Sequence, residues 1–140
     1  MTVKITHAMT VDVEDYFHVA AFNKVIDPTT WDTWPCRVEA NTHKLLQLFD
    51  DKNIKITFFI LGWVAERYPE LVKSIRAQGH EIASHGYSHQ LIYKQDQGVF
   101  KAETAKSKQI LEELGQAPVT GYRAASYSIT RKSLWALDIL

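Results

Sequence analysis

The chain alternates between short runs of β-branched and apolar residues and longer segments in which apolar residues recur at helical spacing. The short runs predict buried strands, and the helical spacing predicts helices that bury one face. Each predicted helix is long enough to carry the chain back and start a parallel strand, so the order predicts an α/β fold with a parallel sheet. The predicted strands are residues 3–13, 54–61, 80–84 and 118–126, and the predicted helices are residues 38–49, 64–78, 96–114 and 130–140.

Proline, glycine and threonine residues mark where the predicted helices begin and end. Pro69 lies inside the second helix, and a new helical segment is expected from Glu70 because a proline pushes the residue before it out of the α region. Gly79 and Gly115 are expected to end the second and third helices. Thr130 is expected to cap the last helix.

The composition narrows the classes of protein. A chain of 140 residues is long enough for one domain with a sizeable core and too short for two. Its 16 basic and 16 acidic side chains cancel, which leaves no overall field to attract nucleic acid or an anionic membrane. The longest apolar stretch, around residues 58–61, is far short of a membrane span, and no signal peptide is visible, so a cytoplasmic location is expected. The single cysteine, Cys36, excludes an intrachain disulfide and a thiolate zinc cluster.

Side chains capable of chemistry follow three of the predicted strands. Ligands of a parallel α/β sheet bind outside the carboxyl ends of its strands, so these side chains are expected to meet at one edge. His85 and His89 are four residues apart, and two neutral imidazoles with one carboxylate leave an open coordination position, as in catalytic zinc sites. The pair alone is also compatible with two histidines of the surface or core. The side chains at this edge are Asp12, Glu14, Asp15, His85, His89 and Arg123.

Four motifs, taken together and in this order, resemble those of the polysaccharide deacetylase family (NodB homology, carbohydrate esterase family four). They are TVDVEDYFH at residues 10–18, TFFILG at 57–62, GHEIASHGYSH at 79–89 and GYRAASYS at 121–128. Within the family, the chain is most similar to the branch found in bacterial exopolysaccharide gene clusters. The resemblance implies a distorted (β/α) barrel, with residues 1–140 as the N-terminal part of a single domain that is incomplete at its C-terminus.

The resemblance also implies roles for individual residues. His85 and His89 would bind a divalent metal, usually zinc. Asp12 would be the general base that takes the proton from the attacking water, and Arg123 would pair with that base and keep it ionised. Tyr127 would line the substrate groove, and its backbone N–H could help to stabilise the oxyanion. Ala125 stands where the family usually has proline.

The identity of the acidic metal ligand stays open between Glu14 and Asp15. The commonest family pattern has two adjacent aspartates, the base followed by the ligand, and this chain departs from it. If the chain follows an Asp-x-Asp pattern, Asp12 is the base and Glu14 the ligand. If the adjacent pair is matched instead, Glu14 is the base and Asp15 the ligand. Strand geometry favours the first alternative, since residues two apart face the same side, although a bulge would undo this argument.

The activity implied by the resemblance is the removal of N-acetyl groups from sugar units of a polysaccharide or oligosaccharide. The alternatives are a hydrolase of cyclic amides or ureides such as allantoin, on the same scaffold, and a non-catalytic carbohydrate-binding fragment. Family members continue with a late histidine that serves as general acid. This chain ends before that motif with an apolar segment, so we expect a shortened chain with low or zero activity. We also expect an open sheet edge that favours a homo-oligomer.

Aromatic residues crowd the predicted loop at residues 27–35 and the segment before it. Exposed aromatics there could stack on sugar rings, whereas the alternative is burial beneath the loop. His18 is expected near the site without an assigned role, and His80 is interpreted as an ordinary polar position. The aromatic residues concerned are Tyr16, Phe17, Trp31 and Trp34.

Overall fold

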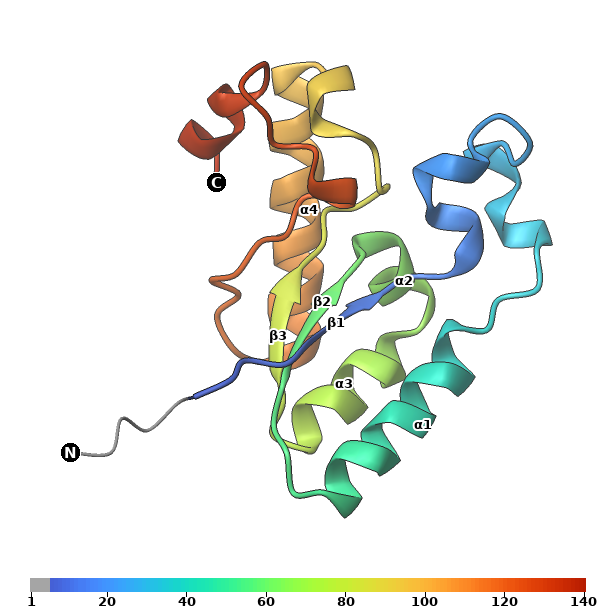
Figure 1. Ribbon diagram of the computed structural model, residues 1–140, viewed down its shortest axis with the longest axis vertical. Coiled ribbons are helices and arrows are strands. Elements are labelled where there is room, and N and C mark those ends of the chain that lie inside the picture. Colours follow the sequence, from blue (N-terminus) through green and yellow to red (C-terminus); the bar gives the residue numbers. More distant parts are fainter. Residues whose placement is uncertain (1–5) are drawn as a thin grey trace.

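A computed structural model describes residues 6–140, which are built around three parallel strands. The strands are β1 (Thr10–Val13), β2 (Thr57–Ile60) and β3 (Glu81–Ser84), in the order β1-β2-β3 (Figure 1). The carboxyl ends of all three strands therefore meet at one edge of the sheet, as the sequence predicts.

Four α-helices connect and cover the strands (Figure 1). They are α1 (Val38–Asp51), α2 (Gly62–Arg67), α3 (Pro69–Ala77) and α4 (Gln97–Gly115). Helix α1 packs against α3, α3 packs against α4, and α4 packs against β3, so consecutive helices are neighbours in a single layer. Parallel strands with their helices in one outer layer are the arrangement of a (β/α) barrel, of which these residues form a section.

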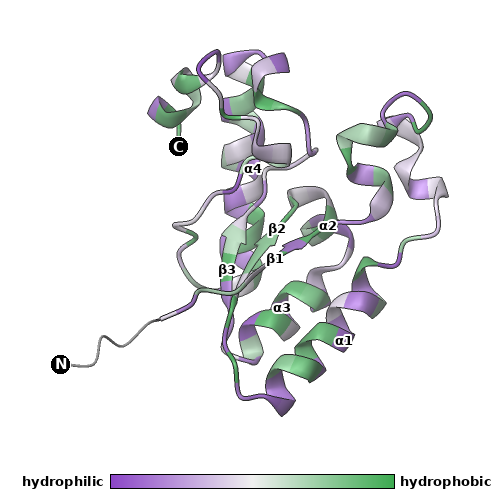
Figure 2. Ribbon diagram, in the orientation of Figure 1, coloured by the Kyte–Doolittle hydropathy of each residue, from purple (hydrophilic) through white to green (hydrophobic). Residues whose placement is uncertain are grey.

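The core lies between the sheet and this layer of helices. Alternate residues of β2 point into it, and Phe58 and Ile60 are both fully buried. Leu71 and Ile75 of α3 and Leu111 of α4 meet them from the helical side. Full burial of such a side chain contributes about 1.5–3 kcal/mol. Figure 2 accordingly shows β2 as hydrophobic, while α1 and α3 alternate between hydrophobic and hydrophilic residues.

Most predicted helices are confirmed, with two changes at their ends. The second helix is divided at Pro69, but the new segment begins at Pro69 itself, because the first helical position needs no N–H. Gly79 has a φ of +79° after α3, as a helix-ending glycine should. Helix α4 ends at Gly115 as predicted, but the left-handed residue that terminates it is the next one, Gln116, and not the glycine. An added Cβ at Gly115 would lie 3.0 Å from the Ile82 side chain, so close packing accounts for this glycine.

The first predicted strand and the long loop differ from expectation. Of the strand predicted at residues 3–13, residues 3–5 lie outside the described part of the chain, and pairing begins only at Thr10. The strand predicted at 54–61 is shortened to β2. The polar segment before α1 is wound into 3₁₀ turns rather than an irregular loop: Tyr16–His18, Ala20–Phe22 and Pro28–Thr33.

The strand predicted at residues 118–126 is wrong, because only one bridge joins this segment to β3. Ser84 donates its N–H to the Gly121 carbonyl at 2.9 Å, and its carbonyl accepts from Arg123 N at 2.9 Å. Before the bridge, the N–H and carbonyl of Val119 are bonded by Glu112 and Lys108 of α4 instead of by β3. After it, the chain turns into a 3₁₀ segment, Ala125–Tyr127, whose last two residues have positive φ and cannot extend a strand.

The helix predicted from Thr130 is also wrong, since only a short 3₁₀ helix, Leu134–Asp138, forms. The Ser133 hydroxyl accepts from Thr130 N at 2.9 Å and donates to the Ser128 carbonyl at 3.0 Å. Such local side-chain bonds compete with helical ones.

Pairing of a second copy at an open sheet edge stays a prediction. No helix within residues 6–140 is long and apolar enough to cross a membrane.

Candidate active site

A carboxylate and two imidazoles converge beyond the carboxyl ends of β1 and β3. Glu14 comes one residue after β1 ends, His85 directly follows β3, and His89 lies in the loop that continues from it. One ligand atom from each of the three lies within 4.8 Å of the others. Glu14 Oε2 is 2.9 Å from His89 Nε2, and the centroids of the His85 and His89 rings are 5.2 Å apart. The structure thus brings together three of the residues that the sequence placed at this edge.

His85 is held in one orientation by a backbone carbonyl. Its Nδ1 lies 2.8 Å from the Arg123 carbonyl oxygen, which can only accept, so Nδ1 carries the hydrogen and Nε2 has a free lone pair. The side chain is 2% exposed, and this burial is the main reason that the pKa of His85 is lowered. His85 is therefore a neutral imidazole with its free nitrogen turned to the site, as metal-binding histidines are oriented.

The loop that carries His89 is fixed to the start of α2 and to α4. Gly86 has a φ of +77°, and its carbonyl accepts from Gly62 N at 2.8 Å. Ser88 donates to the Glu103 carboxylate at 2.6 Å. His89 itself adopts a φ of +53°, an uncommon conformation for a residue with a side chain, and the loop anchors hold it there.

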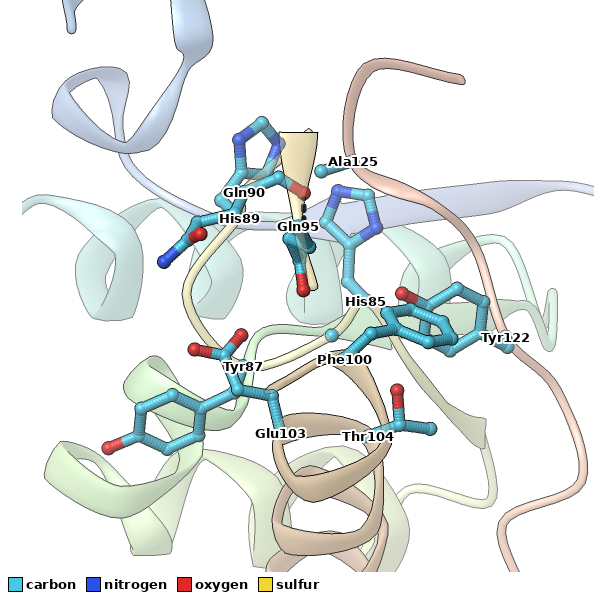
Figure 3. A pocket seen from close by; sticks show the side chains of 11 residues that line it. His85, Tyr87, His89, Gln90, Gln95, Phe100, Glu103, Thr104, Tyr122 and Ala125 are labelled. Atoms are coloured by element: carbon cyan, nitrogen blue, oxygen red, sulfur yellow. Dashed lines mark hydrogen bonds between the residues drawn. The ribbon is translucent and has the colours of Figure 1, made fainter. Parts of the chain in front are cut away.

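Figure 3 shows the side of the histidines that faces α4. His85 and His89 approach one another above Glu103, Thr104 and Tyr122. The space between these side chains is about 10 Å³, which is room for one water molecule. A substrate therefore has no room on this side and must approach the histidines from the opposite one.

Glu14 has the properties of a metal ligand. Burial raises its pKa, but the close contact with His89 and the neighbouring His85 more than offset this, so the net pKa is lowered. Oε2 is buried, and its 2.9 Å contact with His89 Nε2 lacks hydrogen-bond geometry, so this ionised oxygen has no well-directed donor within residues 6–140. One ionised carboxylate and two imidazoles are a donor set that a divalent cation such as zinc prefers. These residues fit a metal ion.

Asp12 and Arg123 form an ion pair beside the three ligands, as the sequence predicts. Arg123 Nη1 donates to Asp12 Oδ1, while Nη2 donates to Thr10 Oγ1 at 2.9 Å. The guanidinium also lies 3.9 Å above the Phe59 ring, and Phe59 is the register partner of Asp12 in β2. The second oxygen of Asp12 is 3.9 Å from His85 Nε2. One oxygen of Asp12 is thus held by arginine while the other faces the point where the ligands converge.

Asp15 does not join this group. Its carboxylate accepts the backbone N–H groups of Tyr16 at 2.8 Å and Val38 at 2.9 Å, together with that of Arg37. Burial raises the pKa of Asp15, but these donors outweigh it and the net pKa is lowered. Asp15 therefore ties the first 3₁₀ turn to the start of α1, with its side chain turned away from the histidines.

Tyr127 borders the same site with its side chain 84% exposed. It lines a cavity of about 210 Å³ together with the ion pair and the three ligands. Its backbone N–H, expected from the sequence to face an oxyanion, instead donates to the Ala124 carbonyl at 3.2 Å. The 3₁₀ turn at Ala125–Tyr127 uses this donor, so that expectation is corrected for the structure described.

Sequence reasoning left His18 without a role, and the structure buries it next to the site. The side chain is 1% exposed, and the charges of Glu14 and His89 act on it. The available signal was its position, four residues after Glu14 and inside the motif that also carries Asp12.

Comparisons with known proteins agree with this geometry. A family model described as polysaccharide deacetylase matches residues 28–139. A peptidoglycan-N-acetylglucosamine deacetylase of Bacillus cereus is 37% identical over 109 residues, which cover 76% of this chain and 39% of the relative. A chitooligosaccharide deacetylase of Rhizobium leguminosarum bv. trifolii is 27% identical over 100 residues, which cover 71% of this chain and 43% of the relative.

Solved structures give the same result for the fold. A peptidoglycan N-acetylglucosamine deacetylase in complex with a benzamide ligand superposes with a TM-score of 0.69 at 27% identity. The match covers 94% of this chain and 51% of that one. This chain therefore spans about two fifths of the length of the two relatives above and about half of the solved structure.

Proposed function

The chain belongs to the polysaccharide deacetylase family, and from that premise we propose that it carries the metal-binding part of a carbohydrate N-deacetylase. The reaction is hydrolysis of an acetamide on a sugar unit, with water as the nucleophile and acetate as a product. The observation that carries the proposal is the convergence of Glu14, His85 and His89 beside the Asp12–Arg123 ion pair.

In this proposal Glu14, His85 and His89 hold a divalent metal, most simply zinc. Three protein ligands leave a coordination position open, which is the pattern of catalytic rather than structural zinc. When bound, such a metal lowers the pKa of a water molecule to ~7 and polarises the carbonyl under attack. The chain contributes the ligand orientation, because the bond from His85 Nδ1 to the Arg123 carbonyl keeps Nε2 turned inward.

Asp12 is the general base in this proposal. Its free oxygen borders the ligands, 3.9 Å from His85 Nε2, and can accept the proton of the attacking water. Arg123 holds the other oxygen in a hydrogen-bonded ion pair, which fixes the orientation of the carboxylate. Arg123 is thus a positioning residue for Asp12.

Glu14, rather than Asp15, is proposed as the acidic ligand. Glu14 Oε2 is buried beside His89 without a hydrogen bond in the described part of the chain, whereas Asp15 is occupied by backbone donors. A carboxylate that already accepts several N–H groups has little left to offer a cation. This supports the register in which Asp12 is the base and Glu14 the ligand.

The proposed substrate is a polymer or oligomer that contains N-acetylglucosamine, such as an exopolysaccharide. The relatives in Bacillus and Rhizobium carry the names of peptidoglycan and chitooligosaccharide deacetylases, and both substrates contain this sugar type. The exposed ring of Tyr127 at the edge of the cavity is suited to lie against a sugar ring.

Release of acetate tests the proposal. We expect zinc-loaded protein to release acetate from N-acetylated chito-oligosaccharides and to leave allantoin intact. Protein with His85→Ala should release none and contain no stoichiometric metal. Hydrolysis of allantoin alone would favour the cyclic-amide alternative. Binding of chito-oligosaccharide without acetate release by metal-loaded protein would favour a carbohydrate-binding module.

A further inference from the structure

His18 is enclosed by aromatic rings that fix its orientation. The centroid of its imidazole lies 4.4 Å from that of Phe17, 4.5 Å from Trp31 and 4.8 Å from Trp63. All three rings are themselves buried. Two aromatic residues of the first loop and Trp63 of α2 thus form a box around His18.

The tautomer of His18 follows from one hydrogen bond. The backbone N–H of Asp15 donates to His18 Nδ1 at 2.8 Å, so Nδ1 is the acceptor. A ring nitrogen that accepts a hydrogen bond carries no hydrogen, so the ring described is a neutral imidazole. A neutral ring with an accepting Nδ1 carries its hydrogen on Nε2. That buried N–H has no hydrogen-bond partner within residues 6–140.

Glu14 precedes His18 by four residues on the same segment, and its charge and that of His89 act on the His18 ring. Glu14 Oε2 is a buried acceptor that also has no hydrogen bond in the described chain. His18 is not one of the three side chains whose ligand atoms lie within 4.8 Å of one another, so it is not itself a proposed ligand.

We propose that His18 is a positioning residue of the metal centre, whose Nε2–H donates to the Glu14 carboxylate and aims its remaining lone pairs at the metal. The inference rests on the proposed function, in which Glu14 is the acidic ligand. Two of the three ligands then have an outer partner from a different segment: His85 has the Arg123 carbonyl, and Glu14 has His18.

His80 provides a matched control at the other end of the sheet. It is also 1% exposed and packs among aromatic rings, those of Phe49 and Phe58. Its Nδ1 accepts from Ile56 N at 3.3 Å, and its buried Nε2 likewise has no partner within residues 6–140. His80 precedes β3, whereas the proposed ligands follow the strands. It therefore shares with His18 the burial, the aromatic contacts, the accepting Nδ1 and an Nε2 without a partner in the described chain, but it lies away from the proposed ligands.

Competition with a chromophoric zinc chelator tests the inference on the full chain. We expect His18→Phe to weaken zinc binding by about tenfold to a hundredfold, the range for loss of an outer-shell partner. His18→Gln, which keeps an N–H near the Nε2 position, should recover most of the affinity. His80→Phe should bind zinc as the unchanged protein does. Equal affinity in His18→Phe and the unchanged protein would overturn the inference, as would an equal loss in His80→Phe.

A second measurement does not depend on the fold of a His18 variant or on metal. In long-range ¹H–¹⁵N spectra of the metal-free protein, the His18 Nε2–H should be protected from exchange and should shift when Glu14→Gln is introduced. An unshifted signal, or one shifted upfield by the face of Trp31, means that the N–H points elsewhere. If the unchanged protein binds no zinc while this signal responds to Glu14, the proposed function fails and the His18–Glu14 contact stands.

Discussion

Glu14 and Asp15 are neighbours in the sequence, yet their carboxylates belong to two different parts of the molecule. Glu14 faces the histidines that follow β3, with a buried oxygen that accepts no hydrogen bond among residues 6–140. Asp15 faces the loop before α1, where backbone N–H groups occupy its oxygens. Successive side chains of an extended segment point to opposite sides, so the two acids enter different surroundings. What a carboxylate can bind is decided by which lone pairs its neighbours leave free.

The largest expected effect comes from removing the charge of Glu14. Glu14→Gln should lose the stoichiometric metal, because a neutral amide oxygen replaces the single anionic ligand beside two neutral imidazoles. Metal content by mass spectrometry on protein purified without a histidine tag measures this. About one divalent ion per chain is expected for the unchanged protein and none for the variant. Full metal content in Glu14→Gln would show that another acid is the ligand.

The Asp12→Asn variant should distinguish the role of Asp12 from that of Glu14, whose side chain lies on the same side of the segment. Asp12 is paired with Arg123 rather than with the histidine cluster, so the variant should keep its metal. Acetate release should fall by roughly 10²–10⁴-fold, the usual contribution of a general base. Loss of metal in this variant would mean that Asp12 is a ligand, and unchanged turnover would remove it from the mechanism.

Asp15→Ala should affect stability instead of metal. The change leaves the buried N–H of Val38 and its neighbours without an acceptor, at a cost of about 1–3 kcal/mol in the free energy of unfolding. Urea denaturation measures the change, and the variant should still bind about one metal ion per chain. A variant of normal stability that has lost its metal would reverse the assignments of Glu14 and Asp15.

The same pair shows how far the sequence could go. The order of the main elements and the meeting of Asp12, Glu14, His85, His89 and Arg123 at one edge were predictable, because strand ends in a parallel sheet converge. Alternation along β1 favoured Glu14 over Asp15 on the side of the histidines. The sequence could not reveal that Asp15 is occupied, since the N–H groups of Arg37 and Val38 come from more than 20 residues away.

The errors have a similar cause. Residues 118–126 have the composition of a strand, but Glu112 and Lys108 of α4 bond the backbone of Val119 and leave one bridge to β3. His18 carried no recognisable pattern as a partner of the site. Its burial depends on Trp31 and Trp63, which lie far along the chain. In each case, side chains from outside the local segment decide the structure that the segment adopts.

The smallest expected effect is a dependence of stability on pH that comes from Asp15. Its pKa is lower in the folded protein than in the unfolded chain, so its contribution is complete above the unfolded value of about 3.9 and is lost as the pH falls further. Urea denaturation of metal-free protein should show the free energy of unfolding falling below about pH 4, and Asp15→Ala should fall less steeply there. Glu14 also has a lowered pKa, so by the same linkage Glu14→Gln should flatten the profile as well. A profile of Asp15→Ala as steep as that of the unchanged protein would show that Asp15 contributes nothing to the acid sensitivity of folding. A flatter profile for Asp15→Ala assigns that share of the acid-sensitive stability to the loop before α1.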